Sequence, residues 1–227
     1  MKNLRIKQPR SLTELVVERL REAIIEGQFA LGENISEDKL AEAFGVSRTP
    51  VRDALMQLQQ TGLVIVRPKR GSFVFSPTLA DVEELCEYRL MLETQALKLS
   101  MDRDLAGLIR AAQMQVGAMS EAQDSGDQRG YARADTAFHR SFFDHCGNRF
   151  VQEAFQLAEG RLATLRTVLT VPYRQRRDAS YDEHRQIVEM IKARDVSALH
   201  RILEEHIGRT LRVAQDALPV AQSAKKA

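Results

Sequence analysis

Apolar residues recur every three to four positions along most of this chain, a spacing that predicts a mainly helical protein. Residues 11–26 (SLTELVVERLREAIIE) form one such apolar face, and Ser11 with Glu14 makes a capping-box pattern at its start. A shorter helix is expected from Ser36 to Gly45. Glycine adopts a left-handed backbone at little cost, so Gly45 is suited to end this helix in a sharp turn.

A third helix is expected directly after this turn. Ser47 is predicted to cap it by accepting a hydrogen bond from a free amide, and Pro50 lies in the first turn, where a missing N–H costs nothing. Apolar residues further along face the core, so Arg48, Thr49 and Arg52 are expected to project outward. Two helices joined in this way predict a helix-turn-helix.

The pattern then changes to two short β-type runs, 63–67 and 72–75. They flank a basic tip made of Pro68, Lys69, Arg70 and Gly71. A hairpin directly after a helix-turn-helix is the wing of a winged helix, and a cationic tip suits a phosphate backbone or a minor groove. Each feature alone is typical of an ordinary solvated surface, but their order along the chain favours DNA binding.

The second half of the chain returns to a helical pattern. Pro77 marks a short linker, and Thr78 with Asp81 forms another capping-box pattern. Helix breaks are expected at Gly126, Gly130, Gly147, Pro172 and Asp195. We therefore expect a mainly α protein: a winged helix-turn-helix over 1–75, a linker over 76–79, an all-α bundle of six or seven helices over 80–217, and a flexible tail over 218–227.

Composition and charge leave this interpretation unchanged. The chain has 227 residues, 44% hydrophobic and 28% charged, as is ordinary for a globular protein. Residues 1–75 hold 12 Lys and Arg against 9 Asp and Glu, a mild basic excess that permits nucleic-acid binding. No run approaches the roughly 20 apolar residues of a membrane span, and the N-terminus lacks a signal sequence, so a cytoplasmic location is expected. Cys86 and Cys146 show no CxxC spacing and are expected to be buried, reduced thiols.

Four residues of the second half suit a metal site. Asp135 and His139 are four apart and share one helix face, while His184 and His206 belong to two later helices. One carboxylate and three imidazoles from three helices are able to converge on a divalent cation and leave positions open for an oxygen ligand. The alternative is an ordinary helical Asp–His pair with satisfied core histidines. His145 and His200 share no stripe with this set.

The first half resembles a known family. The stretch IIEGQFALGENISEDKLAEAFGVSRTPVRDALMQLQQTGLVIVRPKRGSFV is similar to the winged-helix domain of the GntR family of bacterial transcription regulators. The chain departs from the family pattern at Leu31, where a proline is usual, and at Asp38, where an arginine is common. The resemblance implies double-stranded operator DNA as the partner, contacted by Ser47, Arg48, Thr49 and Arg52 of the helix and Lys69, Arg70 and Gly71 of the wing.

Residues 80–215 resemble the FCD ligand-binding domain of the FadR branch of that family. The matching stretches are YRLMLETQAL, DTAFHRSFFDHCGNRF, SYDEHRQIVEMIKARD and LEEHIGR. The resemblance implies that the metal ligands are Asp135, His139, His184 and His206. Zinc is the ion expected in a purified sample, with nickel, manganese and iron as alternatives.

A small carboxylate effector is expected to complete the metal's coordination. Arg89 aligns with an arginine of the family pattern RxxLE and would clamp the carboxylate, or it pairs with Glu93 one turn later. Asn148 is expected to orient the site through a hydrogen bond. Ser180 either lines the pocket or, with Glu183, caps the helix that carries His184.

Enzymatic activity is not expected. Glu183 and Glu205 each precede a histidine of the proposed site, and a residue adjacent to an inward-facing helix position points away from it. The sequence therefore predicts a homodimeric transcription regulator, a repressor by resemblance, that reads an inverted repeat and responds to a carboxylate metabolite. A constitutive DNA-binding protein with a structural metal and a metal-dependent enzyme with a vestigial winged helix are the alternatives.

Overall fold

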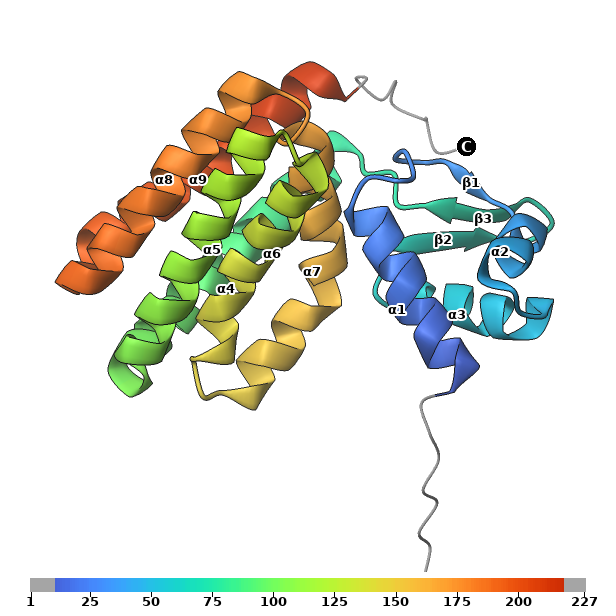
Figure 1. The fold of residues 1–227 in the computed structure, drawn as a ribbon, viewed down its shortest axis with the longest axis horizontal. Helices are drawn as coiled ribbons and strands as arrows, with labels where there is room; N and C mark the ends of the chain where they lie inside the picture. The colour runs from blue at the N-terminus through green and yellow to red at the C-terminus, as the bar shows by residue number, and fades with distance from the viewer. Residues whose placement is uncertain (1–10, 219–227) are drawn as a thin grey trace, which may run out of the picture. The chain divides into compact units, whose positions relative to one another are not determined.

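The computed structural model describes residues 11–218 of the chain. These residues divide into two compact units, the first formed mainly by residues up to Ser76 and the second mainly by residues from Pro77 onward (Figure 1). The tail expected at 218–227 lies outside the described residues except for Leu218. Every helix within 11–218 is too short or too polar to cross a bilayer.

The first unit combines three helices with a small antiparallel sheet. Its elements are α1 (Leu12–Ile25), β1 (Asn34–Ile35), α2 (Glu37–Phe44), α3 (Arg48–Gln60), β2 (Val64–Arg67) and β3 (Gly71–Val74). The strand order is β1-β3-β2, with Val64 opposite Val74 and Asn34 opposite Phe73. The predicted hairpin is thus confirmed, and β1 adds an edge strand too short for its pattern to be recognised in the sequence.

Local capping explains how the helix-turn-helix forms. The Ser11–Glu14 capping box is present, and the Ser36 hydroxyl accepts from the Lys39 amide at the start of α2. Gly45 has φ 66° and ends α2 in the left-handed conformation, as predicted. Ser47 holds the N-cap position of α3, but its side chain makes no capping hydrogen bond, so that part of the prediction is wrong.

Burial of one apolar face of each helix holds this unit together. Leu20 and Ile24 of α1 pack with Val51 and Leu55 of α3 and with Leu63 before β2, and all five are almost completely buried. Burying such a side chain stabilises the fold by about 1.5–3 kcal/mol. The opposite face of α3 is therefore left in solvent.

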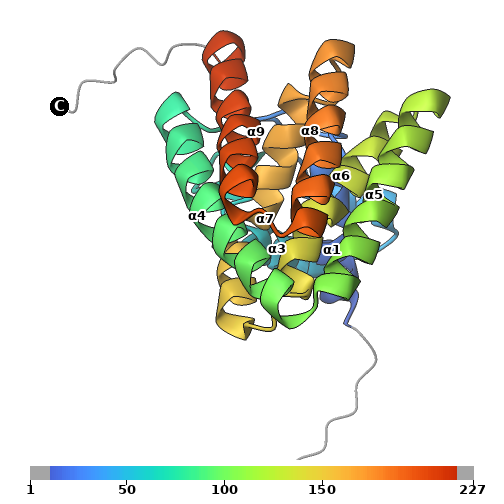
Figure 2. The same cartoon turned by 90° about the vertical axis from the view of Figure 1, so that its left-hand side faces the viewer.

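The second unit is an all-α bundle. Its helices are α4 (Leu79–Arg103), α5 (Leu105–Ser125), α6 (Gln128–Asp144), α7 (Arg149–Leu169), α8 (Arg174–Ala193) and α9 (Val196–Ala217). Figure 2 shows α4, α9, α8 and α5 side by side in a front row, with α6 and α7 behind it. Side chains that point inward from both layers therefore meet in the core.

Most predicted helix ends of the bundle are confirmed. Thr78 and Asp81 form the capping box of α4, and Gly126 ends α5 with φ 71°. Gly130 is not a break, since it lies inside the first turn of α6. Asp104 is a break that the pattern does not reveal: it ends α4 and accepts from the Gly107 amide to start α5.

Candidate functional site

Three histidines from three helices converge in the core of the bundle. His139 of α6, His184 of α8 and His206 of α9 are 0%, 0% and 3% exposed. The Nε2 atom of His139 lies 3.3 Å from the Nε2 atoms of both His184 and His206. Their ligand atoms form a compact group able to hold a metal ion. We call these three residues the histidine group.

Asp135, the fourth predicted ligand, lies at the edge of the histidine group. It occupies α6 one turn before His139, and its Oδ1 atom is 3.7 Å from the Nε2 atom of His184. Its Oδ2 atom accepts a hydrogen bond of 2.6 Å from Nε of Arg166. One carboxylate oxygen is thus engaged by a cation while the other faces the histidines.

The electrostatics of this core keep the imidazoles neutral and the carboxylate charged. Burial, together with the nearby Arg89, lowers the pKa of His139, His184 and His206, that of His184 to about 4. Burial alone would raise the pKa of Asp135, but the Arg166 guanidinium is the main group that lowers it, to about 2. Unprotonated nitrogens and an ionised carboxylate are the forms that bind a cation.

These pKa shifts predict how the stability of the metal-free protein depends on pH. Below pH 6.5 the three histidines are protonated in the unfolded chain but stay neutral in the folded one, so the unfolded state binds more protons. Stability is therefore complete above pH 6.5 and falls as the pH drops toward 4, by about 3 kcal/mol from His184 alone. Urea unfolding in chelator at pH 7, 6, 5 and 4 measures this loss, and a pH-independent midpoint would contradict it.

Carboxylates lie behind two of the histidines. Glu183 Oε2 lies 2.7 Å from Nδ1 of His206, and Glu93 Oε2 lies 3.2 Å from Nδ1 of His139. Glu183 favours the proton on Nδ1 of His206, which leaves the Nε2 lone pair of His206 for the centre of the group. The expectation that Glu183 points away from the site is wrong, because its carboxylate reaches His206 on α9.

Arg89 pairs with Glu93, which is one of the two interpretations that the sequence left open, and it also lies beside the histidine group. It is 1% exposed, and its Nε donates to Glu93 Oε1 across one turn of α4 at 2.8 Å. Its Nη2 atom lies 2.9 Å from Nε2 of His139. The guanidinium therefore reaches the histidine group while its charge is paired with a buried carboxylate.

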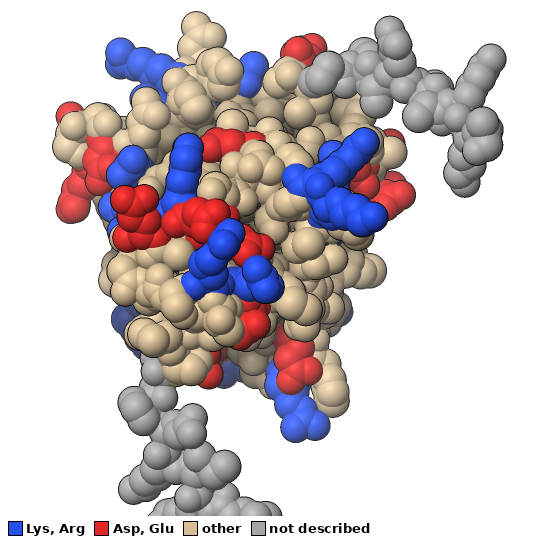
Figure 3. Space-filling view, turned by 90° about the vertical axis from the view of Figure 1, so that its right-hand side faces the viewer, with Lys and Arg blue, Asp and Glu red and all other residues tan. Residues whose placement is uncertain are grey.

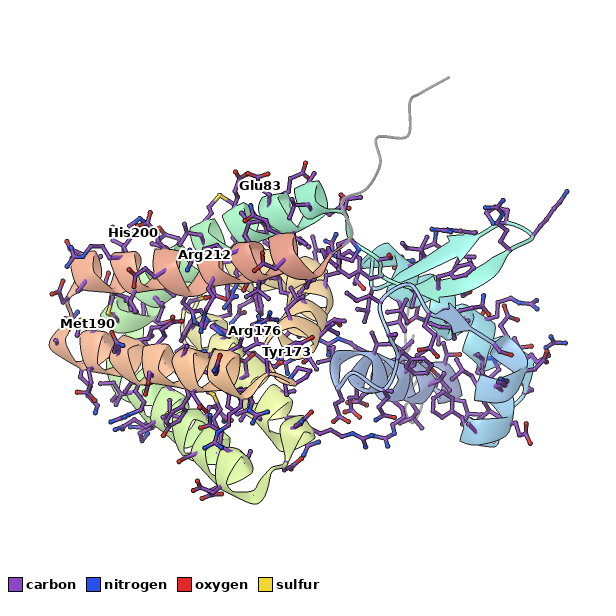
Figure 4. The ribbon with its side chains drawn as sticks, turned by 90° about the horizontal axis from the view of Figure 1, so that it is seen from above. Glu83, Tyr173, Arg176, Met190, His200 and Arg212 are labelled. Atoms are coloured by element: carbon purple, nitrogen blue, oxygen red, sulfur yellow. The ribbon has the colours of Figure 1, made fainter. Side chains whose placement is uncertain are left out.

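The other two predicted effector residues have different positions. Asn148 caps α7, where its Oδ1 atom accepts from the amides of Phe150 and Val151. It lies 18 residues before Arg166 on this helix, a separation of about 27 Å, so its expected role at the site is wrong. Ser180 does not cap α8, which begins at Arg174 after Tyr173 (Figure 4). It is buried one turn before His184, on the same helix face.

The two remaining histidines lie outside the histidine group, and the two cysteines are free thiols, as expected. His145 pairs with Asp104 at 2.6 Å, and the half-exposed His200 lies 3.4 Å from Glu204 on the outer face of α9 (Figure 4). Cys86 and Cys146 are buried and free. Three of the five histidines thus form the histidine group, and the other two lie elsewhere.

The predicted DNA-contacting residues of α3 lie on the surface of the first unit. Ser47, Arg48, Thr49 and Arg52 are all exposed at the start of this helix. Arg48 makes two contacts with the Asp38 carboxylate, at 2.7 and 2.8 Å, and Arg52 lies 3.2 Å from Glu37. Basic and acidic groups accordingly alternate on this face (Figure 3).

These exposed ion pairs are weak. Such pairs contribute about 0–1 kcal/mol, because both partners remain solvated. A phosphate or a base edge is therefore able to displace the carboxylates of α2. Until then, the pairs hold both guanidinium groups at the N-terminal end of α3.

The wing carries its cations on a strained turn. Lys69, Arg70 and Gly71 are exposed, and Lys69 has φ 60°. Gly71 has φ 99°, and a Cβ atom there would lie 3.1 Å from Nδ2 of Asn34. Glycine is thus required at position 71 by the backbone, which sets how the two cations project.

An exposed helix start with two arginines, followed by a basic wing and joined to a bundle with a buried histidine group, defines a winged-helix DNA-binding protein with a separate all-α domain. Models of known families agree: bacterial regulatory proteins of the gntR family match residues 12–74, and the FCD domain matches residues 84–209. The chain belongs to the GntR family of DNA-binding transcription regulators and carries an FCD domain.

Individual relatives span nearly the whole chain. The uncharacterized HTH-type transcriptional regulator YdhC of Bacillus subtilis is 28% identical over 189 residues, 83% of this chain and 84% of that protein. The HTH-type transcriptional repressor NanR of Enterobacter sp. is 27% identical over 222 residues, 87% and 83% of the two chains. The structure of E. coli McbR/YncC superimposes with a TM-score of 0.78 at 22% identity, covering 92% and 99%, which shows the shared fold.

Proposed function

We propose that this regulator is a repressor whose operator binding responds to a small carboxylate bound at a metal site in its FCD domain. The observation that carries this proposal is the convergence of three buried imidazoles, in which Nε2 of His139 lies 3.3 Å from the Nε2 atoms of His184 and His206. Asp135 offers its Oδ1 atom as a fourth ligand. Nitrogen-rich sites of this kind suit zinc, and also nickel, iron and manganese.

The residues around the site have distinct roles in this proposal. A bound metal supplies open coordination positions that attract a carboxylate oxygen. Glu183 and Glu93 orient the imidazoles of His206 and His139, and Arg89 pairs with the incoming carboxylate. Ser180 lines the same face of α8 as His184.

We place operator binding on the first unit. Arg48, Thr49 and Arg52, with Ser47, read base edges from the start of α3, while Lys69, Arg70 and Gly71 follow the phosphate backbone or minor groove. A homodimer would present two such helices to an inverted repeat. The effector changes operator affinity only as far as it binds the DNA-competent and the released arrangements unequally. The repressor role is supported by relatives such as NanR.

A purely structural metal is the second candidate, favoured by the near-complete burial of the histidine group. Thermal-shift measurements with a panel of small organic acids, with and without chelator, separate the two. A metal-dependent stabilisation by an acid supports the sensor. If chelator lowers the melting temperature but no acid raises it in metal-loaded protein, the metal is structural. Glu183, engaged by His206 and Arg209, is poorly placed as a catalytic base.

Glu183 provides a test of the metal site that leaves every ligand in place. Glu183→Gln is expected to weaken zinc affinity about 10- to 100-fold, because a neutral amide is a weaker acceptor than a carboxylate for the Nδ1–H group of His206. Competition with a fluorescent zinc chelator measures this. Glu189→Gln, on the exposed side of the same helix, is the matched control and should leave the affinity unchanged. Equal affinities for both variants would remove Glu183 from the site.

A further inference from the structure

Arg166 of α7 is a buried cation with only part of its hydrogen-bonding capacity used within residues 11–218. Its side chain is 5% exposed, and its Nε atom donates to Asp135. Both terminal amino groups, Nη1 and Nη2, are buried and find no hydrogen-bond partner within residues 11–218. A buried charged group without its hydrogen bonds is strongly unfavourable. An acceptor brought by a ligand would remove this cost.

The position of Arg166 ties it to the histidine group. A single carboxylate, that of Asp135, separates them: Oδ2 contacts Arg166 Nε at 2.6 Å and Oδ1 lies 3.7 Å from His184 Nε2. Arg166 therefore forms a second cationic point of the same buried region, contributed by a helix that carries no member of the histidine group.

The charge balance of the region indicates how much negative charge a ligand must bring. The cations Arg89 and Arg166 are balanced by Glu93 and Asp135, and imidazoles that bind a metal do so in their uncharged form. A divalent ion then adds two positive charges to a buried core. A monocarboxylate would leave one of them uncompensated, whereas a dianion neutralises both.

The geometry also indicates where those charges lie on the ligand. The acceptors are needed in two places, at the histidine group and at Nη1 and Nη2 of Arg166, with Asp135 between them. A phosphate ester concentrates its charge at one end. Two carboxylates joined by a short carbon chain divide it, and a planar carboxylate fits the paired amino groups of a guanidinium.

We propose, building on the metal-dependent sensor above, that the effector is a short dicarboxylate: one carboxylate binds at the metal and the other is held by Nη1 and Nη2 of Arg166. Arg166 thereby selects dicarboxylates over monocarboxylates. Its pairing with Asp135 fixes the guanidinium before the ligand arrives.

Calorimetric titration of the zinc-loaded, full-length protein tests this selection. The probes are malonate, succinate and glutarate, each compared with its monoamide, which keeps the length but carries one charge. At least one dicarboxylate is expected to bind about 30-fold or more tightly than its monoamide, as for a buried charge pair that loses one partner. Glycerol 3-phosphate, a dianion with its charge at one end, should bind no better than the monoamides.

Variants of α7 then connect the selection to Arg166. Arg166→Gln is expected to reduce the ratio between acid and monoamide to within about threefold, while zinc still binds. Arg161→Gln, a half-buried arginine of the same helix that donates to Leu157 O, should keep the full ratio. If Arg166→Gln fails to fold, the ratio between the affinities for acid and monoamide in the unchanged protein still tests whether the site selects dicarboxylates.

Two results would overturn the proposal. Monoamides that bind as tightly as the dicarboxylates would show that one carboxylate suffices. The proposed metal-dependent sensor would then be retained, but Arg166 would not select dicarboxylates. The same conclusion follows if the zinc-loaded protein binds none of the three dicarboxylates. Absence of zinc binding, in contrast, would contradict the metal site itself.

Discussion

A His139→Ala, His184→Ala double variant is expected to purify without divalent metal, whereas the unchanged protein retains about one ion per chain. Both residues present Nε2 atoms to the centre of the histidine group, and their loss leaves His206 with Asp135. Two ligands do not hold a zinc ion in competition with buffer, since structural and catalytic sites use three or four. Elemental analysis by mass spectrometry after gel filtration gives the result directly.

The chain offers a matched control for this experiment. A His145→Ala, His200→Ala double variant removes two imidazoles outside the histidine group and should keep its metal. Both variants should still bind operator DNA measurably in their metal-free forms, because the winged helix has its own core. Stoichiometric metal in the His139, His184 variant would show that the assigned ligands are wrong.

Arg52→Ala is expected to weaken binding to the specific operator by about 1–3 kcal/mol, or roughly 5- to 150-fold. The side chain projects from the first turns of α3, where it forms an exposed pair with Glu37. Its loss would therefore remove the proposed base contact at little cost to folding. Fluorescence anisotropy with an operator selected from random-sequence DNA measures the change.

Selectivity distinguishes a base contact from a general charge effect. Arg52→Ala should relax the preference at one operator position, whereas Arg19→Ala, which removes an exposed arginine of α1, should leave sequence preference intact. Glu37→Gln should preserve or raise affinity, because it frees Arg52 from a competing carboxylate. If Arg52→Ala lowers the affinity for random and selected DNA equally, Arg52 contacts phosphate rather than a base.

Most helices, turns and strands can be predicted from the sequence, because they depend on the residues within each segment. Apolar spacing gives the helices, Gly45 gives the turn, and alternation around a basic tip gives the wing. The features that the sequence pattern does not predict correctly are also local. A two-residue strand, β1, has no periodicity, and Asp104 separates two helices without a glycine or proline. The prediction of a helix break at Gly130 is wrong, because a helix tolerates glycine in its first turn.

The site could be predicted only in part. Histidine positions on three helices, together with the family resemblance, predict the histidine group that the structure brings together. The role of Arg166, the approach of Glu93 to His139 and the contact of Glu183 with His206 could not be predicted, since the burial of a charged residue depends on which helices pack around it. An arginine within the apolar stretch LATLRTVL is the one local hint of Arg166.

X-ray absorption at the zinc edge of the purified protein tests the central claim most directly, because it reports the ligands without any substitution. We expect three imidazole nitrogens at about 2.0–2.1 Å from the zinc, with oxygen completing the coordination, and a change in the oxygen contribution when succinate is added. Sulfur scattering at about 2.3 Å, or a zinc shell with fewer than three imidazoles, would contradict it.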